Sequence, residues 1–294
     1  MRCSMIVRRG AAALLFALTT SAAAAAQVVA PAELQGVVAR IRADASPRLG
    51  HETVHAPALI ARLYERRAFA PVWDSVRGVG LLHALRGLAA DGLEPLDYHL
   101  AVLESDGANP QPPARAAELD VLRTDALLRA AYDLRFGRVD ARTMRRRTDL
   151  SRALTGTNAD AAAALLLDMH PASALERVRP GHFVYRGLRD ALRHLEQVRG
   201  DGGWATIPPG RLSLDSINAR VPLLRRRLAQ DGDLQGDTVS SHFDATVDSA
   251  VRRFQHRHGL NDDGIVGPAT LAALNVSVTR RIDAVRVNLE RARW

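Results

Sequence analysis

The sequence predicts a mostly all-α protein, with a helical N-terminal domain, a three-helix module and a final helix. Three observations support this class: apolar residues return at intervals of three and four, strand-like alternation is scarce, and glycine and proline stand at the ends of the apolar runs. We expect a signal peptide over residues 1–26, a helical domain over 27–215, a three-helix module over 216–276 and a C-terminal helix over 277–294.

The N-terminus has the three parts of a secretory signal peptide. Arginines at positions 2, 8 and 9 precede an apolar run over 11–18, and small residues over 22–26 precede Gln27. The run is shorter than the roughly 20 apolar residues that a membrane-spanning helix needs. We expect cleavage after Ala26 by general secretion, because the residues after Arg8 and Arg9 do not favour twin-arginine export. No later segment is predicted to cross a membrane, so the expected location is the periplasm or cell envelope.

Composition excludes several functions. All 40 basic residues are arginine and the formal net charge is +8, yet no basic stripe interleaved with aromatic residues indicates nucleic-acid binding. The single cysteine, Cys3, lies in the signal peptide. The exported chain should therefore have no disulfide, no cysteine nucleophile and no thiolate metal ligand, and we expect no cofactor and no metal site.

The N-terminal domain is expected to hold long amphipathic helices. One apolar stripe runs from Leu119 to Leu134 and ends at Gly137, and another runs from Leu188 to Leu195 and is closed by Gly200. Residues 106–113 are a loop by composition, since proline and glycine interrupt helices. The glycine- and proline-rich stretch 200–215 marks the domain boundary, and Trp204 within it is predicted to pack between elements rather than to stack on a sugar.

Three short helices are predicted after this boundary. The first carries Val221 and Leu228 and ends at Gly232. The second spans roughly 245–258, with Asp244 as its N-cap and Gly259 as its C-cap. A turn over 260–267 leads into the third, which begins near Pro268 and stops near Asn275. A core of about 60 residues is small but sufficient for a domain.

This module resembles the peptidoglycan-binding domain type 1 family. Residues 250–260 read Ala-Val-Arg-Arg-Phe-Gln-His-Arg-His-Gly-Leu, 263–270 read Asp-Gly-Ile-Val-Gly-Pro-Ala-Thr, and 274–275 read Leu-Asn. The resemblance implies a three-helix unit that binds peptidoglycan. We expect exposed residues of this motif to contact the ligand, and our candidates are Gln255, His258, Asn261 and Asp263. The remaining motif positions are expected to serve caps, turns and core: Phe254, Gly259, Gly264, Gly267, Thr270 and Asn275.

A second resemblance covers other parts of the chain. The strings Leu-Tyr-Glu-Arg-Arg-Ala-Phe-Ala-Pro-Val-Trp at 63–73, Asp-Gly-Leu-Glu-Pro-Leu-Asp-Tyr-His at 91–99 and Asp-Gly-Gly-Trp-Ala-Thr-Ile-Pro at 201–208 are similar to the scaffold domain of large murein L,D-transpeptidases. Residues 287–294 resemble the segment before the catalytic domain of that family. The family's nucleophile is a cysteine in a Ser-x-Gly-Cys context, which this sequence lacks, so we expect no catalytic residue on this chain.

The sequence also lacks the motifs of several other enzyme classes. The sequence contains no His-Glu-x-x-His pair, no Gly-x-Ser-x-Gly elbow and no phosphate-binding loop ending in lysine. His256 and His258 point away from each other on a helix and are predicted to be solvated. Asp262 and Asp263 are expected to cap a tight turn. Residues 97–99 are expected to be a turn and a helix start after Pro95.

Three functional hypotheses follow from these patterns. The first is a non-catalytic peptidoglycan-binding and scaffold protein. The second is the regulatory or substrate-binding part of an L,D-transpeptidase whose catalytic domain is on a separate chain or lost by truncation. It is motivated by an apolar face over 282–294 that we expect to lack a partner. The third is a poorly folding remnant.

Overall fold

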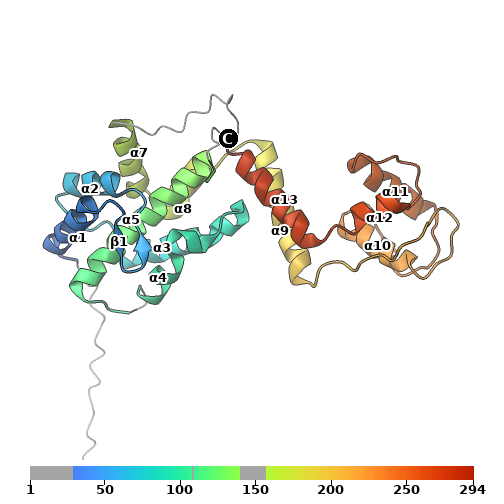
Figure 1. Ribbon diagram of the computed structural model, residues 1–294, viewed down its shortest axis with the longest axis horizontal. Coiled ribbons are helices and arrows are strands. Elements are labelled where there is room, and N and C mark those ends of the chain that lie inside the picture. The colour runs from blue at the N-terminus through green and yellow to red at the C-terminus, as the bar shows by residue number, and fades with distance from the viewer. Residues whose placement is uncertain (1–28, 108, 140–156) are drawn as a thin grey trace, which may run out of the picture.

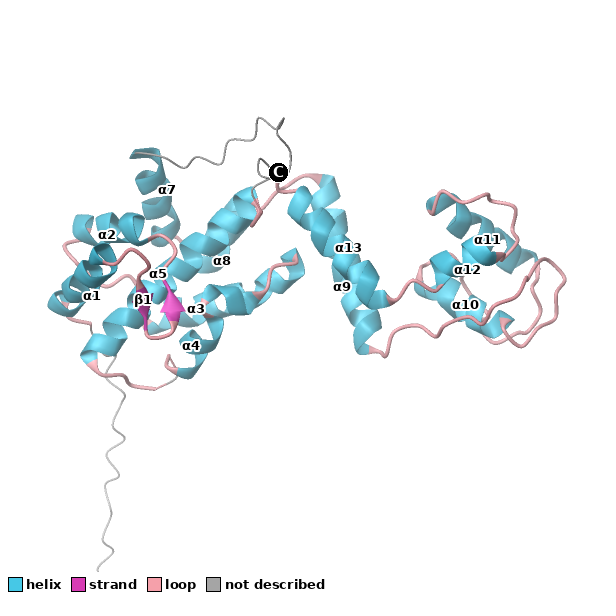
Figure 2. Ribbon diagram, in the orientation of Figure 1, coloured by secondary structure: helices cyan, strands magenta, loops and turns pink. Residues whose placement is uncertain are grey.

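The computed structural model describes residues 29–107, 109–139 and 157–294 (Figure 1). Within these ranges it contains twelve α-helices and one two-stranded sheet, so the prediction of a mostly all-α protein is confirmed. Figure 2 shows two helical lobes joined through a pair of helices. The expected signal peptide over 1–26 lies outside the described residues.

The N-terminal lobe is built around one long helix, α5 (Pro113–Phe136), whose face of alanine and leucine is buried. The predicted stop at Gly137 is confirmed, because this residue takes a φ of +79° that side chains disfavour. The other elements of this lobe are α1 (Pro31–Ala43), β1 (Arg48–Leu49), β2 (Glu52–Thr53), α2 (Pro57–Arg66), α3 (Ser75–Arg86), the 3-10 turns η1 (Gly87–Asp91) and η2 (Pro95–Tyr98), α4 (Leu100–Ser105), α7 (Thr157–Asp168) and α8 (Pro171–Val178).

Two antiparallel helices, α9 (Phe183–Gly200) and α13 (Val278–Arg291), connect the lobes (Figure 1). Ile282 and Leu289 of α13 are buried against Tyr185, Leu192 and Leu195 of α9. The expectation that the last helix leaves its apolar face without a partner is therefore wrong. Sequence periodicity identified the face, but it could not indicate that a helix about ninety positions earlier in the chain covers it.

The carboxylate of Asp91 anchors this helix pair to the N-terminal lobe. It is fully buried and accepts hydrogen bonds from Arg179 Nε at 2.9 Å and from the Tyr185 hydroxyl at 3.1 Å. Arg189 Nε lies 2.9 Å from the same carboxylate, and Arg293 donates to the backbone carbonyl of Asp91. Asp91 thus fixes both helices to the N-terminal lobe: α9, which leads away from it, and α13, which leads back.

The C-terminal lobe contains the three predicted helices, α10 (Val221–Gln230), α11 (Ala245–Arg257) and α12 (Pro268–Leu274). Asp244 caps α11 as predicted, because its carboxylate accepts from the amides of Thr246 and Val247. The apolar core of this lobe also includes Ile207 and Leu212, which precede residue 216. Leu212 bridges to Val266, so the segment after α9 packs as part of the three-helix lobe.

Trp204 packs where the helix pair meets the C-terminal lobe, which agrees with the predicted packing role. Its Nε1 donates to the carbonyl of Val276 at 3.0 Å, and the guanidinium carbon of Arg227 lies 3.8 Å from the ring centroid. Arg227 is itself buried and donates to the carbonyl of Leu274 at 3.1 Å. This stack ties α10 to the segments that leave and enter the lobe.

Candidate peptidoglycan-binding site

Gln255 organises the turn that follows α11. Its Nε2 donates to Asp263 Oδ1 at 3.1 Å, to the Ile265 carbonyl at 2.9 Å and to Thr270 Oγ1 at 3.1 Å. Its Oε1 accepts from the Gly264 amide at 2.9 Å. These bonds use the side-chain amide fully and connect α11, the 260–267 turn and α12.

The expectation that Gln255 is exposed is wrong, because only 1% of its surface is accessible. The residue occupies a helix position that faces the core, between Val251 and the turn. A buried glutamine is retained when every polar atom has a partner, which the turn supplies. Gln255 therefore positions the candidate site instead of presenting its amide to a ligand.

His258 lies half-buried at the end of α11. Its ring stacks on Phe254 with centroids 4.0 Å apart, and its Nδ1 lies 2.8 Å from the Phe254 carbonyl. Burial lowers the pKa of His258 below its usual value, and the nearby charges of Arg281 and Arg257 act in the same direction. The lowered pKa favours the neutral imidazole, which remains partly accessible at the surface.

Asn261 and Asp263 lie on the exposed side of the same turn. Asp263 Oδ1 accepts from the Ile265 amide at 2.9 Å, and this backbone hydrogen bond lowers the pKa of the Asp263 carboxyl. Asn261 Nδ2 donates to Asp263 Oδ2 at 3.2 Å. The predicted capping role of the aspartate is consistent with these contacts, and both side chains stay accessible to a ligand.

The other motif positions serve structure. Phe254 is fully buried, and Gly259 and Gly264 have φ angles of +64° and +76°. A Cβ at Gly264 would collide with the side chain of Asp248. Three further motif residues stabilise α12 and its surroundings: Gly267 as its N-cap, Thr270 as a partner of Gln255, and Asn275, whose amide pairs with both backbone groups of Ile207.

The two histidines of the sequence His-Arg-His behave differently from each other. His256 is exposed, with 83% of its side-chain surface accessible, whereas His258 turns onto Phe254. Among the described residues, the group of His, Cys, Asp and Glu side chains close enough to hold a metal ion lies elsewhere.

That group is a buried cluster of His99, Asp125 and the partly exposed His55 in the N-terminal lobe. Residues 95–99 do form the predicted turn before α4, but His99 adopts a φ of +59° and is buried. Burial alone would raise the pKa of Asp125, yet hydrogen bonds from His55 and His99 lower it to about 2. The pKa of His99 is raised by Asp125 and Glu52 against the effect of burial. Positions so far apart in sequence carried no pattern that predicted this cluster.

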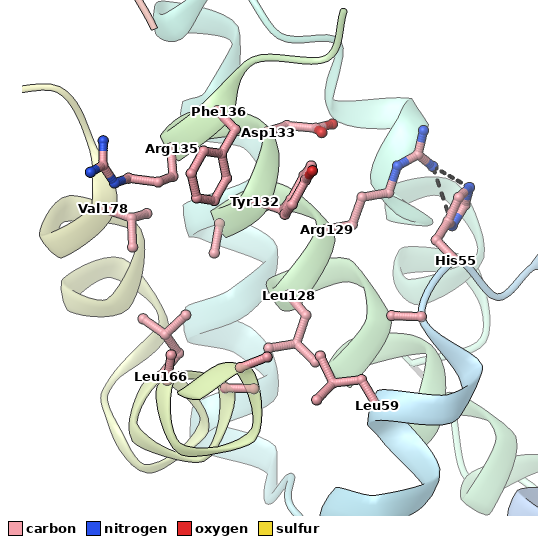
Figure 3. A pocket seen from close by; sticks show the side chains of 15 residues that line it. His55, Leu59, Leu128, Arg129, Tyr132, Asp133, Arg135, Phe136, Leu166 and Val178 are labelled. Atoms are coloured by element: carbon pink, nitrogen blue, oxygen red, sulfur yellow. Dashed lines mark hydrogen bonds between the residues drawn. The ribbon is translucent and has the colours of Figure 1, made fainter. Parts of the chain in front are cut away.

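A cavity of about 610 Å³ lies beside the cluster, and His55 lines it (Figure 3). Its walls come from α5, α7 and α2 and are mostly apolar, with Leu59, Leu128 and Leu166 as examples. Arg129 reaches across its edge to His55 (Figure 3). No pattern in the sequence predicted this cavity.

Comparison with known families matches both parts of the chain. The Scaffold domain family matches residues 58–192, and the putative peptidoglycan binding domain family matches residues 218–274. An uncharacterized protein in the bpoA1 3'region of Kitasatospora aureofaciens is 38% identical over 74 residues, which are 25% of this chain and 62% of that protein. The match thus spans less than two thirds of that relative.

The first match covers most of the N-terminal lobe, and the second covers the three helices of the C-terminal lobe, so the two matches together indicate a modular, peptidoglycan-associated protein. The two matches follow one another along the chain in the order that the two resemblances predicted, so the predicted architecture is confirmed. The function of the chain is therefore associated with peptidoglycan and the cell envelope. None of the described helices has the length and apolar character needed to cross a membrane.

The position of His258 predicts a pH dependence of stability. Because its pKa is lower in the folded protein, the unfolded chain binds the proton more tightly, and stability is lost as the pH falls below the unfolded value of about 6.5. We expect the free-energy difference between the original protein and His258→Phe to shift in favour of the variant between pH 7.5 and 5.5. Denaturant unfolding of both proteins at each pH measures it. A difference that is constant, or that shifts the other way, would contradict the assignment.

Proposed function

We propose that this protein is a non-catalytic peptidoglycan-binding and scaffold protein, which acts in the periplasm after export by its N-terminal signal peptide. The match of residues 218–274 to a putative peptidoglycan binding domain carries the proposal. The helical N-terminal lobe and the α9–α13 pair hold this module at a distance from the rest of the protein. In this proposal residues 27–215 are the scaffold, 216–276 bind the wall, and 277–294 connect the module back to the scaffold.

The surface proposed to contact peptidoglycan is the turn after α11. Asn261 and Asp263 are exposed there and hydrogen-bond to each other, and the half-buried His258 precedes them in the chain at the end of α11. Amide and carboxylate groups suit the hydroxyl, amide and ammonium groups of glycan strands and stem peptides. Gln255 supports this surface from beneath through its bonds to Asp263 and Gly264.

Sedimentation with insoluble sacculi tests the proposal. Residues 27–294 should pellet with sacculi at physiological salt, and recovery of all the protein in the supernatant would count against wall binding. Asn261→Ala should weaken binding about fivefold, because one hydrogen bond contributes roughly 1 kcal/mol. Asn109→Ala is the matched control, since Asn109 is an exposed asparagine in a loop of the N-terminal lobe.

The alternative is a regulatory or substrate-binding part of a murein L,D-transpeptidase whose cysteine domain is supplied by a separate chain. The Scaffold domain match favours it, but the apolar face that first motivated it is covered by α9. Incubating the purified chain with muropeptides tests whether it catalyses cross-linking by itself, which neither the scaffold proposal nor this alternative allows. Cross-linking by the chain alone would overturn both, and an adjacent reading frame with a Ser-x-Gly-Cys motif would support the alternative.

A further inference from the structure

Three potential metal-ligand atoms converge in the N-terminal lobe. Asp125 Oδ2 lies 3.0 Å from His55 Nδ1 and 2.9 Å from His99 Nε2, and each of the three residues offers a ligand atom within 4.8 Å of those of the other two. The residues come from three separate places: the segment before α2, the start of α4 and the middle of α5. Only the tertiary fold brings them together.

The polar atoms of His99 and Asp125 that face away from the cluster already have hydrogen-bond partners. His99 Nδ1 lies 2.6 Å from Glu52 Oε2, a contact that leaves Nε2 directed at the cluster. Asp125 Oδ1 accepts from the amides of His55 at 2.9 Å and Ala56 at 3.1 Å, which leaves Oδ2 for the centre. Metal-binding histidines and carboxylates in proteins are oriented by such outer contacts, and a carboxylate behind the imidazole is a recurring partner.

We propose that His55 Nδ1, His99 Nε2 and Asp125 Oδ2 form a binding site for a divalent transition-metal ion, with zinc as the best-suited metal. Two neutral imidazoles and one carboxylate are typical zinc ligands and are also compatible with cobalt. Three protein ligands are one fewer than a closed structural zinc site uses, so one coordination position stays open.

The ion has a route to this site. His55 is 36% exposed at its side chain, and it lines the cavity of about 610 Å³ (Figure 3). His99 and Asp125 are buried behind it. An entering ion would therefore meet His55 first and then the two buried ligands.

Without the ion, the cluster is a hydrogen-bonded network. The position of Arg129 favours either this ion-free network or the metal-bound cluster. Arg129 Nη1 lies 2.8 Å from His55 Nε2, which then accepts a hydrogen bond while Nδ1 donates to Asp125. Coordination through Nδ1 requires the proton to move to Nε2, so Arg129 must turn away from it. The same Nη1 also donates to the Asp97 carbonyl at 2.7 Å, and this bond can hold the guanidinium after it has left His55 Nε2. Arg129 therefore competes with the metal, both through this bond and through its charge.

Titration of the full chain carrying Cys3→Ser with Co²⁺ tests the site, because cobalt reports its coordination by visible absorption. We expect one ion per chain, displaced by Zn²⁺. His55→Ala should weaken binding at least 100-fold and Glu52→Gln 10- to 100-fold, whereas Arg129→Gln should tighten it. His256→Ala, at an exposed histidine, is the control and should change nothing.

A second readout, the unfolding temperature, keeps the result independent of folding defects. Zn²⁺ should raise the unfolding temperature of the Cys3→Ser protein and fail to raise that of His55→Ala, whose Asp125 still accepts the two backbone amides. Equal Co²⁺ binding by the Cys3→Ser and His55→Ala proteins, loss of binding in His256→Ala, or weaker binding in Arg129→Gln would each overturn the proposal.

Discussion

Replacing Asp91 by alanine is expected to destabilise the junction between the N-terminal lobe and the α9–α13 pair by roughly 3–5 kcal/mol. The Asp91 carboxylate is inaccessible to solvent and faces the guanidinium groups of Arg179 and Arg189 as well as the Tyr185 hydroxyl. Removing it leaves the largely buried Arg189 without this carboxylate and leaves Arg179 with the exposed Glu176 as its carboxylate partner, and this cost exceeds the loss of an ordinary hydrogen bond.

Denaturant unfolding measures the stability change, and hydrogen exchange in α9 shows whether the junction opens first. Asp190→Ala is the matched control, because Asp190 pairs with Arg193 on the exposed face of α9. The control should change stability by less than about 0.5 kcal/mol. A loss below about 1 kcal/mol for Asp91→Ala, or unchanged exchange in α9, would contradict the role assigned to Asp91.

Gln255→Leu is expected to lower the stability of the C-terminal lobe more than any other substitution that keeps the size of the side chain. The leucine fits the buried volume but removes every hydrogen bond of the glutamine, so the buried Gly264 amide loses its partner and Thr270 loses one of its two. One or two unsatisfied buried groups cost about 2–4 kcal/mol in total. The loss should fall on the C-terminal lobe, and the 260–267 turn should loosen.

Sacculus binding is expected to fall together with stability in Gln255→Leu, because the turn that carries Asn261 and Asp263 is no longer held from beneath. Gln235→Leu is the control, since Gln235 is an exposed glutamine in the same lobe. Thermal unfolding and sedimentation with sacculi are measured in parallel. If Gln255→Leu retains both stability and binding at the level of the control, the glutamine does not organise the turn.

The sequence predicted the C-terminal helices well because their ends are specified locally. Asp244 caps α11 with its own carboxylate, Gly259 takes the positive φ that ends it, and Pro268 opens α12. Each of these effects acts within about one helical turn, so a residue and its neighbours suffice to predict it.

The candidate wall-binding site was predicted less well. The motif placed Asn261 and Asp263 on an exposed turn, and both are exposed. Gln255 was named as a candidate among the exposed residues of the motif, but its buried bonds to Gly264 and Thr270 override the usual preference of glutamine for solvent. Which side of α11 faces the turn depends on how α12 packs against it.

The sequence by itself determined the helical class, the helix ends and the resemblance of residues 218–274 to a putative peptidoglycan binding domain, since all three depend on periodicity, caps and short-range motifs. The tertiary structure alone decided that α13 is covered by α9, that Asp91 joins the two parts, and that His55, His99 and Asp125 meet. These contacts join residues tens to more than a hundred positions apart. Such contacts between distant residues depend on how whole helices pack, and no local sequence pattern encodes that packing.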